Sequence, residues 1–502
     1  MINSLFRLFT KKRLEQIEYF KENGAEVQLR VFKDLVRRAK DTEWGKKYNY
    51  QGMHSIDDFK KQVPVSTYED IFPFIERMMK GEQNVLWPTP IKWFGKSAGT
   101  TSTRSKFIPV SKESLNDIHS RGGKDILVFY LRSYPDSKIF EGRNLAIAGS
   151  LKETQSDSKI FHGDISAVMV KNLPLWAKIL NTPDTDITLM ENWEEKVDQL
   201  ANIVCRKNVV TIAGVPSWTA LLLKKFLETQ DADTIFDIWP NLELFIHGGV
   251  SFTPYRHLFS ELTPRINYME IYNASEGFFA IQDNLSKRDE MLLMLDYGIF
   301  YEFMPIEEVG KEDPKTVTLD EVKLDKNYAL VISTNGGLWR YMIGDTVKFS
   351  SLSPYRIKVS GRTKHFINAF GEEVIVDNAE RAVSQACSQT GAIVSDFTAA
   401  PVFMEKSNGG AHEWLIEFER EPTDFDKFKK VLDTTLREVN SDYDAKRYKD
   451  MLLRPPVVHC LPRGTFYRWM EKRGKLGGQN KVPRLSNTRE YVEDILKLTY
   501  NQ

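Results

Sequence analysis

Val209-Val210-Thr211-Ile212-Ala213-Gly214-Val215-Pro216-Ser217-Trp218 is the stretch of this chain that decides its fold. The short apolar run at residues 209–212 is typical of a strand that is buried on both faces of a sheet. Ser217 is a good helix N-cap, and the apolar residues after it lie on one side of a predicted helix: Leu222, Leu223, Phe226 and Leu227. A buried strand that leads directly into an amphipathic helix is the repeating unit of α/β proteins.

The same alternation extends along the chain in both directions. Further apolar runs of the buried-strand type lie at residues 145–148, 244–246 and 329–332, with helical patterns between them. Residues 1–90 have the pattern of helices with short breaks. We therefore predict a large N-terminal α/β domain over residues 1–355.

The pattern changes after about residue 354. A helical pattern at about 376–388 is followed by strand-like residues 414–418, by a second helical pattern and by the apolar run 457–460. This order predicts a smaller α+β domain over residues 362–502, a size within the usual range of domains. The linker is expected at about residues 350–362, and a hinge there would make the C-terminal domain mobile.

The composition limits the class of protein. A chain of 502 residues with 41% hydrophobic and 27% charged residues is expected to fold into at least two globular domains. Lys+Arg and Asp+Glu both number 69, so we expect no nucleic-acid partner, because such partners usually select basic domains. Cys205, Cys387 and Cys460 form no C-x-x-C pair, which argues against a zinc knuckle or a disulfide framework and indicates a reducing compartment.

The N-terminal residues 1–20 mix apolar and basic side chains, without the continuous apolar core and small-residue cleavage site of an export signal. Two interpretations are open: a basic amphipathic helix that rests on a membrane surface, or a helix that docks onto its own domain. We favour docking. No run approaches the ~20 apolar residues of a membrane span, so we expect a cytoplasmic protein without a membrane-spanning segment.

A hydroxyl-rich loop is the first candidate for chemistry: Ser97-Ala98-Gly99-Thr100-Thr101-Ser102-Thr103-Arg104-Ser105-Lys106. Backbone N–H groups, hydroxyls and a cation can converge there on one polyanion, as the binding of a triphosphate requires. The loop lacks the G-x-x-x-x-G-K-[ST] order of the Walker loop. Taken alone, it is also compatible with an ordinary surface turn.

Two further motifs follow predicted strands. In His247-Gly248-Gly249 the glycines lie at the carboxyl end of a strand, where α/β sheets bind ligands and where glycine lets a flat group approach the backbone. In Tyr272-Asn273-Ala274-Ser275-Glu276-Gly277, Tyr272 could stack on a planar base and Glu276 could hold a Mg²⁺ that bridges phosphates. The alternatives are a tight turn and a solvated loop carboxylate, and His247 is expected to pack at the strand end.

Three more motifs lie nearer the C-terminus. Asp345, in Tyr341-Met342-Ile343-Gly344-Asp345, could accept two hydrogen bonds from a ribose diol. Gly361-Arg362-Thr363-Lys364 lies at the inferred domain boundary, where a hinge has to be. Gln479-Asn480-Lys481-Val482-Pro483-Arg484 could fold back onto a site, with Pro483 stiffening the backbone. A turn aspartate, a basic surface turn and a solvated basic tail are the respective alternatives.

In their order and spacing, these motifs resemble those of the adenylate-forming superfamily of acyl and aryl ligases. Within that superfamily the chain most resembles the Gretchen Hagen auxin-responsive family of acyl-acid amido synthetases. The residues that carry the closer resemblance are Ser97-Ala98-Gly99-Thr100-Thr101 with Lys106, Gly214-Val215-Pro216-Ser217-Trp218, Tyr272-Asn273-Ala274-Ser275-Glu276-Gly277, Glu302-Phe303, Arg340-Tyr341-Met342-Ile343-Gly344-Asp345 and Lys481-Val482-Pro483-Arg484. The resemblance covers nearly the whole chain.

The resemblance implies a role for each matching position. Tyr272 would lie against adenine, Asp345 would bind the ribose hydroxyls, and Arg362 would reach the ribose or the α-phosphate. Glu276 would help to hold Mg²⁺, and Lys481 is the candidate for the lysine that the small domain brings to the α-phosphate. The residues implied to hold the β- and γ-phosphates of ATP are Ser97, Gly99, Thr100, Thr101, Ser102 and Lys106. Gly248, Gly249 and Ser275 complete the predicted cofactor-binding set, and Lys106, Glu276 and Lys481 are the predicted catalytic residues.

The reaction that the resemblance implies joins a small-molecule carboxylic acid to an amine, expected to be that of an amino acid. ATP first converts the acid into an acyl-adenylate with release of pyrophosphate, and the amine then displaces AMP. Two alternatives stay open. An acid–thiol ligase would form a coenzyme A thioester after the same first step, and a non-catalytic regulator would bind the nucleotide only.

Two positions depart from the family pattern. Thr103 replaces a glycine often found in the phosphate loop, and Met342 replaces an arginine, which removes one cation near the nucleotide. Neither position carries a group that does the chemistry, so we expect an active enzyme. The pocket for the acid is expected between about residues 124 and 218, with Trp218 and Phe161 as apolar candidates.

Overall fold

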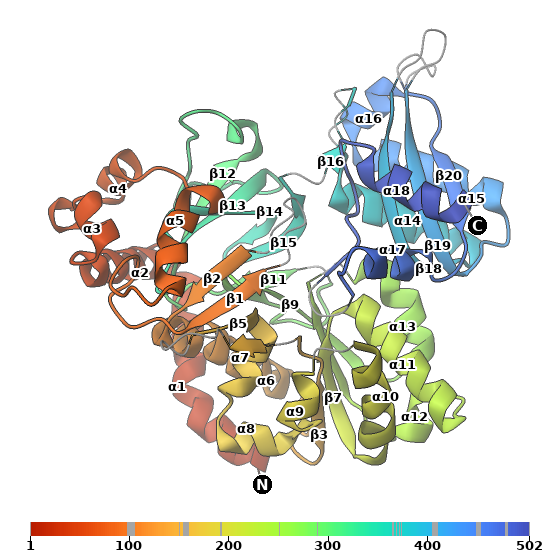
Figure 1. The fold of residues 1–502 in the computed structure, drawn as a ribbon, viewed down its shortest axis with the longest axis horizontal. Coiled ribbons are helices and arrows are strands. Elements are labelled where there is room, and N and C mark those ends of the chain that lie inside the picture. The colour runs from red at the N-terminus through yellow and green to blue at the C-terminus, as the bar shows by residue number, and fades with distance from the viewer. Residues whose placement is uncertain are drawn as a thin grey trace. The chain divides into compact units, whose positions relative to one another are not determined.

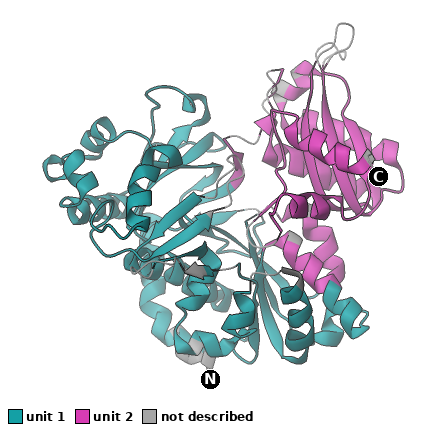
Figure 2. Cartoon of the chain, viewed as in Figure 1, with its two compact units in different colours: residues 1–214, 225–249, 265–358 teal, residues 215–224, 250–264, 359–502 magenta. Residues whose placement is uncertain are grey.

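The computed structural model describes residues 2–97, 106–149, 151–153, 160–190, 193–249, 252–288, 290–363, 366–367, 369–370, 372, 374–403, 410–447, 453–476 and 480–500. The chain forms two compact units (Figure 2). Unit 1 comprises residues 1–214, 225–249 and 265–358, and unit 2 comprises residues 215–224, 250–264 and 359–502. Each unit has a hydrophobic core of its own.

A mixed sheet of eleven strands, in the order β12-β13-β14-β15-β11-β10-β9-β8-β7-β3-β6, forms the centre of unit 1 (Figure 1). Its parallel part consists of β6 (Asn181–Thr182), β3 (Arg143–Ala146), β7 (Val209–Gly214), β8 (Leu244–Gly248) and β9 (Asn267–Ala274). Its antiparallel part consists of β10 (Gly277–Ile281), β11 (Met291–Leu293), β12 (Ile299–Pro305), β13 (Asn327–Thr334), β14 (Tyr341–Leu352) and β15 (Tyr355–Arg362). The apolar runs at 209–212 and 244–246 form buried central strands, as predicted.

Helices cover this sheet and precede it in the chain. Residues 1–90 are helical with short breaks, as predicted, in α1 (Ile2–Glu22), α2 (Gly24–Ala39), α3 (Glu43–Lys47), α4 (Ile56–Gln62) and α5 (Tyr68–Met79). The later helices of unit 1 are α6 (Arg121–Ser133), α7 (Ile165–Lys171), α8 (Leu175–Leu180), α9 (Thr185–Thr188), α10 (Trp193–Ile203) and α12 (Ile235–Ile238). Helix α11 (Pro216–Gln230) begins in unit 2 and ends in unit 1. A second, four-stranded sheet in the order β2-β1-β5-β4 contains β2 (Lys106–Val110), β1 (Trp93–Ser97), β5 (Phe161–Asp164) and β4 (Leu151–Glu153).

The first helix docks onto its own unit. Arg13 on α1 forms ion pairs with Asp125, at 2.7 Å, and with Asp296, and it lies over the ring of Tyr297. Ile17 and Phe20 of the same helix are buried in the core. The predicted docking of the N-terminal helix is therefore confirmed. Across the described ranges, no helix has both the length and the apolar character that a bilayer crossing needs.

Unit 2 is an α+β unit with a three-stranded sheet in the order β18-β19-β20. Its strands are β18 (Ile393–Val402), β19 (Ala411–Arg420) and β20 (Val457–Leu461), and a short hairpin pairs β16 (Phe366–Ile367) with β17 (Val374–Ile375). Its helices are α13 (Arg256–Leu262), α14 (Val376–Thr390), α15 (Phe425–Val439), α16 (Ser441–Lys446), α17 (Thr465–Lys472) and α18 (Glu490–Tyr500). The buried residues of α14 and α15 pack against β18 and β19, as the helical spacing predicted.

The run 329–332 lies in a buried strand, as predicted; this strand, β13, is antiparallel to both of its neighbours, a property that short apolar runs do not encode. Two local details were not predicted. Most of the expected linker at 350–362 belongs to the adjacent strands β14 and β15. Helix α11 begins at Pro216, before the predicted N-cap Ser217, and proline suits a first helical position because it needs no donor there.

A buried histidine makes the stability of the fold depend on pH. His119 is 5% exposed, and burial lowers its pKa to about 4 from the ordinary 6.5. Between these values the unfolded chain takes up a proton that the folded protein does not, so stability is lost as the pH falls from 6.5 towards 4. The free energy of unfolding, measured by urea unfolding, falls between pH 7 and pH ~4.5. We expect this fall to be about 2–3 kcal/mol smaller in His119→Gln than in the wild type. Equal losses in the two proteins would contradict this assignment.

Candidate active site

Two antiparallel strands flank the hydroxyl-rich loop. Strand β1 ends at Ser97 and β2 begins at Lys106, and these two residues are paired across the ladder. The loop between them therefore starts and ends at the same place in unit 1. The predicted loop positions Gly99, Thr100, Thr101 and Ser102 lie outside the described residues, so their contact with phosphates stays a prediction.

The motif at residues 272–277 forms a β-hairpin beside that place. Strands β9 and β10 pair up to Ala274 and Gly277, which leaves Ser275 and Glu276 as a two-residue turn. The hydroxyl of Ser275 donates a hydrogen bond of 3.0 Å to the carbonyl oxygen of Lys96, the residue before the last of β1. Glu276 is 6% exposed. The turn is thus attached to the strand that enters the hydroxyl-rich loop.

A direct hydrogen bond joins this hairpin to the Asp345 motif. The hydroxyl of Tyr272 donates to Oδ2 of Asp345 at 2.9 Å. The ring of Tyr272 is buried, and its centroid lies 4.8 Å from that of Phe279. Tyr272 therefore orients the carboxylate that is predicted to bind the ribose, a role that the sequence did not indicate. The predicted stacking of its ring on adenine stays a prediction.

The glycines at the end of β8 allow close packing at the same edge of the sheet. Strands β8 and β9 are parallel, with Gly248 opposite Ile271, and a Cβ added at Gly248 would lie 2.4 Å from the Ile271 carbonyl oxygen. Gly249 has a φ of 83°, which favours glycine. His247 is 2% exposed beside Phe245, so it packs at the strand end as predicted.

Lys106 has a tyrosine neighbour that the sequence did not single out. The Nζ atom of Lys106 lies 5.5 Å from the ring centroid of Tyr68, which is the first residue of α5. The hydroxyl of Tyr68 accepts a hydrogen bond of 2.8 Å from the backbone N–H of Phe107. Burial raises the pKa of Tyr68, and the charge of Glu276 contributes to the shift in the same direction. Tyr68, Lys106 and Glu276 thus belong to one neighbourhood of unit 1.

The structure places Met342, one of the two departures from the family pattern, on strand β14. Its side chain packs against an apolar cluster of Met304, Ala329 and Val331 on the neighbouring strands β12 and β13. Thr103, the other departure from the family pattern, lies outside the described residues.

The segment that carries Lys481 is fixed within unit 2. The carbonyl oxygen of Asn480 accepts a hydrogen bond of 3.1 Å from the indole N–H of Trp218, and that of Pro483 accepts one of 2.6 Å from the hydroxyl of Thr398. Lys481 itself is half-buried. The contact of Trp218 with Asn480 had no sequence signal, because 262 residues separate the two.

Arg484 anchors the same segment more deeply. Its guanidinium forms an ion pair with Asp396, donates to the hydroxyl of Tyr255 at 2.8 Å and lies 4.5 Å from the ring centroid of Phe397. Its backbone carbonyl accepts a hydrogen bond from Ala399 of β18. The chain around Lys481 is therefore attached to strand β18 by backbone and side-chain bonds.

The predicted site residues thus fall into two groups. Unit 1 brings together Lys106, Ser275, Glu276, Tyr272 and Asp345, with Gly248 and Gly249 at the same edge of the sheet. Unit 2 holds Arg362, the last residue of β15, and Lys481. Their approach to the unit 1 residues stays a prediction.

Comparison with known sequences settles the family. Residues 13–268 match the GH3 family N-terminal domain, residues 292–362 the GH3 family central domain and residues 377–490 the GH3 family C-terminal domain. The chain belongs to the GH3 family. This confirms the resemblance to the Gretchen Hagen family that the motifs indicated.

Relatives and solved structures agree with this assignment. The indole-3-acetic acid-amido synthetase GH3.3 of Arabidopsis thaliana is 24% identical, over 94% of this GH3 chain and 91% of its own. The jasmonoyl–L-amino acid synthetase JAR4 of Nicotiana attenuata is 23% identical, over 67% and 68%. The structure of the AtGH3.15 acyl acid amido synthetase in complex with 2,4-DB is similar with a TM-score of 0.79 at 19% identity, over 97% of this chain and 95% of that one.

The fold is shared more widely than the family. A 2-hydroxyisobutyryl-CoA ligase in the postadenylation state is similar with a TM-score of 0.61 at 12% identity, over 95% of this chain and 92% of that one. The predicted α/β class, with a large N-terminal and a smaller C-terminal part as in adenylate-forming ligases, is therefore confirmed.

Proposed function

We propose that this GH3-family protein is an acyl-acid amido synthetase. It uses ATP to activate a carboxylic acid as an acyl-adenylate and transfers the acyl group to the amine of an amino acid. The observation that carries the proposal is the 2.9 Å hydrogen bond from Tyr272 to Asp345, because it joins two nucleotide motifs beside the strand that enters the hydroxyl-rich loop. The amido synthetases GH3.3 and JAR4 among its relatives support amide formation as the second step.

The first step has to replace a poor leaving group. An oxygen of the acid attacks the α-phosphorus of ATP, the bond from that phosphorus to the bridging oxygen breaks, and pyrophosphate leaves. Negative charge shifts among the phosphate oxygens, and fixed cations that stabilise it usually give the largest rate contribution. Lys106 and Lys481 supply these cations in the proposal. Asp345, held by Tyr272, positions the nucleotide through its ribose.

The residues of unit 1 fit a magnesium ion that is shared with substrate phosphates. Within the part of the chain that the structure describes, no three His, Cys, Asp or Glu side chains gather as a protein-only metal site would need. Mg²⁺ usually takes only one or two carboxylates together with substrate phosphates. Glu276, at the hairpin turn, is the carboxylate proposed to hold it. When bound, the ion would neutralise charge on the phosphate oxygens.

In the second step the amine nitrogen attacks the acyl carbon, the bond to the AMP oxygen breaks, and the nitrogen loses a proton. We assign no residue as the base for that proton. The proposed domains are the large one at residues 1–355, which binds ATP and the acid, and the mobile one at 362–502, which brings Lys481. Rotation about residues 350–362 would separate the two steps.

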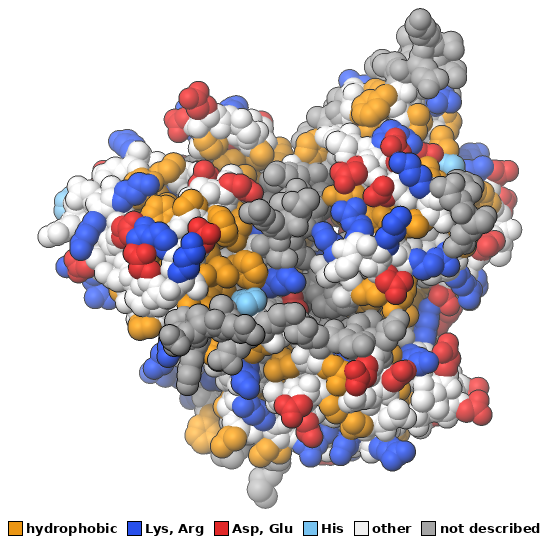
Figure 3. Space-filling model, viewed as in Figure 1, with side chains coloured by type: hydrophobic (Ala, Val, Ile, Leu, Met, Phe, Trp, Pro, Cys, Tyr) orange, Lys and Arg blue, Asp and Glu red, His pale blue; other side chains and the backbone are white. Residues whose placement is uncertain are grey.

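The proposal includes a cytoplasmic location, small-molecule substrates and no nucleic-acid partner. Cys205, Cys387 and Cys460 are all free thiols, which suits a reducing compartment. On the face drawn in Figure 3, Lys and Arg side chains are interspersed with Asp and Glu. On this face, the described side chains thus form no continuous basic stripe of the kind that nucleic-acid binding uses.

The test is acid-dependent exchange of pyrophosphate into ATP with Mg²⁺, across a panel of aryl, indole and fatty acids and without any amine. We expect exchange with one class of acid, which establishes adenylation and names the substrate. Amino acids and coenzyme A are then compared as acceptors, and an amide product decides against the acid–thiol ligase. ATP binding without exchange for any acid would favour the regulatory alternative.

A further inference from the structure

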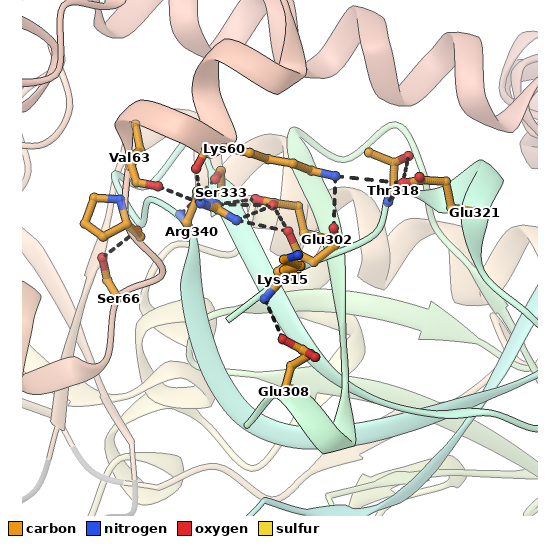
Figure 4. A network of polar contacts seen from close by, with 12 residues as sticks. Lys60, Val63, Ser66, Glu302, Glu308, Lys315, Thr318, Glu321, Ser333 and Arg340 are labelled. Atoms are coloured by element: carbon orange, nitrogen blue, oxygen red, sulfur yellow. Dashed lines mark hydrogen bonds and ion pairs between the residues drawn. The ribbon is translucent and has the colours of Figure 1, made fainter. Parts of the chain in front are cut away.

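A buried ion pair fixes the chain segment that precedes α5. Arg340 and Glu302 are 4% and 0% exposed, and the Arg340 guanidinium donates to both carboxylate oxygens at 2.9–3.1 Å. Its remaining Nη1 donates to the carbonyl oxygens of Lys60, at 2.9 Å, and Val63, at 2.6 Å (Figure 4). The end of α4 and the residues after it are thus attached to strands β12 and β14 through one guanidinium.

The next residues continue this attachment through the backbone. The N–H of Ser66 donates to the carbonyl oxygen of Arg340 at 2.8 Å, and the carbonyl oxygen of Ser66 accepts from the N–H of Met342 at 2.9 Å. Ser66 is therefore bridged to β14, the strand that carries Asp345 three residues after Met342. Its position is fixed relative to the carboxylate that is proposed to bind the ribose.

Helix α5 begins two residues later, at Tyr68, whose side chain contacts the first two residues of β2. Thr67 and Asp70 form a capping box, so the first turn of the helix is well defined. Tyr68 is 9% exposed, with its hydroxyl on the N–H of Phe107 at 2.8 Å and its ring 5.5 Å from the Lys106 ammonium. Both partners lie at the point where the chain leaves the hydroxyl-rich loop.

We propose that Tyr68 is a positioning residue of the nucleotide site, which fixes the C-terminal end of the phosphate loop and holds the Lys106 ammonium towards the phosphates of ATP. The hydroxyl anchors the backbone at Phe107, while the electron-rich ring face attracts the ammonium. The segment 63–68 then sets the distance between the ribose carboxylate on β14 and the phosphate cation on β2. The role of Lys106 in this inference rests on the proposed function.

Two substitutions separate the hydroxyl from the ring. Tyr68→Phe keeps the ring and leaves the Phe107 N–H without its acceptor, so we expect the Kd for Mg·ATP to rise about two- to tenfold. Tyr68→Leu also removes the ring, and we expect a rise of about five- to thirtyfold. The rate of exchange at saturating ATP should fall less than the affinity in both variants. Binding is measured by calorimetry without acid, and exchange with the best acid of the panel.

The matched control is Tyr328→Phe. Tyr328 is buried in the same unit, and its hydroxyl also accepts from a backbone N–H, that of Lys323 at 3.0 Å. This variant should lose similar stability but keep the wild-type Kd for Mg·ATP. A double-mutant cycle in a Lys106→Ala background gives the second criterion. In that background the ring has lost its partner, so the Kd values of the Tyr68→Leu and Tyr68→Phe variants should differ by less than about twofold.

The outcomes separate this inference from the proposed function. The role of Tyr68 would be overturned if Tyr68→Leu bound Mg·ATP with wild-type affinity. It would also be overturned if the effects of Tyr68→Leu and Lys106→Ala on the Kd added fully. Neither result would affect the proposal of adenylation. The wild type could also bind ATP but show no exchange, while the Tyr68 variants bind ATP more weakly. That result would support the role of Tyr68 and overturn the synthetase. A protein that binds no Mg·ATP at all would overturn both.

Discussion

Replacing Glu276 or Lys481 by alanine is expected to lower acid-dependent ATP–pyrophosphate exchange by about two to three orders of magnitude each. Glu276 is the buried carboxylate at the turn that Ser275 bonds to Lys96 of β1, and Lys481 is the cation proposed for the α-phosphate. We expect both variants to keep the fold of the wild type, and the urea unfolding midpoint checks this. Exchange rates at saturating ATP and acid measure the effect.

Two exposed charges serve as controls for these variants. Lys472→Ala removes a lysine at the end of α17 in unit 2, and Glu312→Ala removes a surface carboxylate in unit 1. Both controls should exchange at the wild-type rate. Full activity of Glu276→Ala and Lys481→Ala together would show that the site assignment is wrong. Loss confined to amide formation in Lys481→Ala would instead move that lysine to the second step.

Glu302→Ala is expected to destabilise unit 1 by about 3–5 kcal/mol. The substitution leaves the Arg340 guanidinium 4% exposed and without its carboxylate, and breaking a buried pair costs far more than losing a surface one. The Thr316 hydroxyl also loses its acceptor, since it donates to Glu302 at 2.6 Å. The measurement is urea unfolding at pH 7, followed by a probe of unit 1.

The double variant Glu302→Leu/Arg340→Met tests whether the unpaired charge is the cause. Removing both charges should restore part of the stability that Glu302→Ala loses, because no buried ion is left without a partner. The surface pair Lys326–Glu307 provides the control, and Glu307→Ala should cost less than about 1 kcal/mol. An unchanged midpoint in Glu302→Ala would contradict the structural role of the pair.

Local patterns were sufficient to predict the α/β class and most buried elements. The run at 209–212 and the helical spacing after Ser217 encode burial directly, and both elements form where expected. Strand direction was not accessible, because β13 has the same apolar composition as a parallel strand. The expected linker is a different case, because residues 355–360 alternate between apolar and polar side chains with the period of a strand, and they form most of β15.

The candidate site was predictable as a set of motifs but not as a set of contacts. The hydrogen bond from Tyr272 to Asp345 joins residues 73 positions apart, and the ion pair of Glu302 with Arg340 joins residues 38 positions apart. Nothing in a single sequence couples such positions. Tyr68 was missed for another reason: an aromatic residue at the start of an amphipathic helix is explained by packing alone, and its bond to Phe107 leaves no pattern.

Unit 2 is built from three separate segments of the chain, and this limits the order in which the protein can fold during synthesis. Its segments 215–224 and 250–264 leave the ribosome more than a hundred residues before most of the chain at 359–502 that completes the unit. Until that chain arrives, Tyr255 lacks its bond to Arg484, and the turn around it lacks the cover of α14 and β18. Completion of unit 2 therefore waits for residues 359–502, and a nascent chain stalled before residue 359 would present these apolar residues to chaperones.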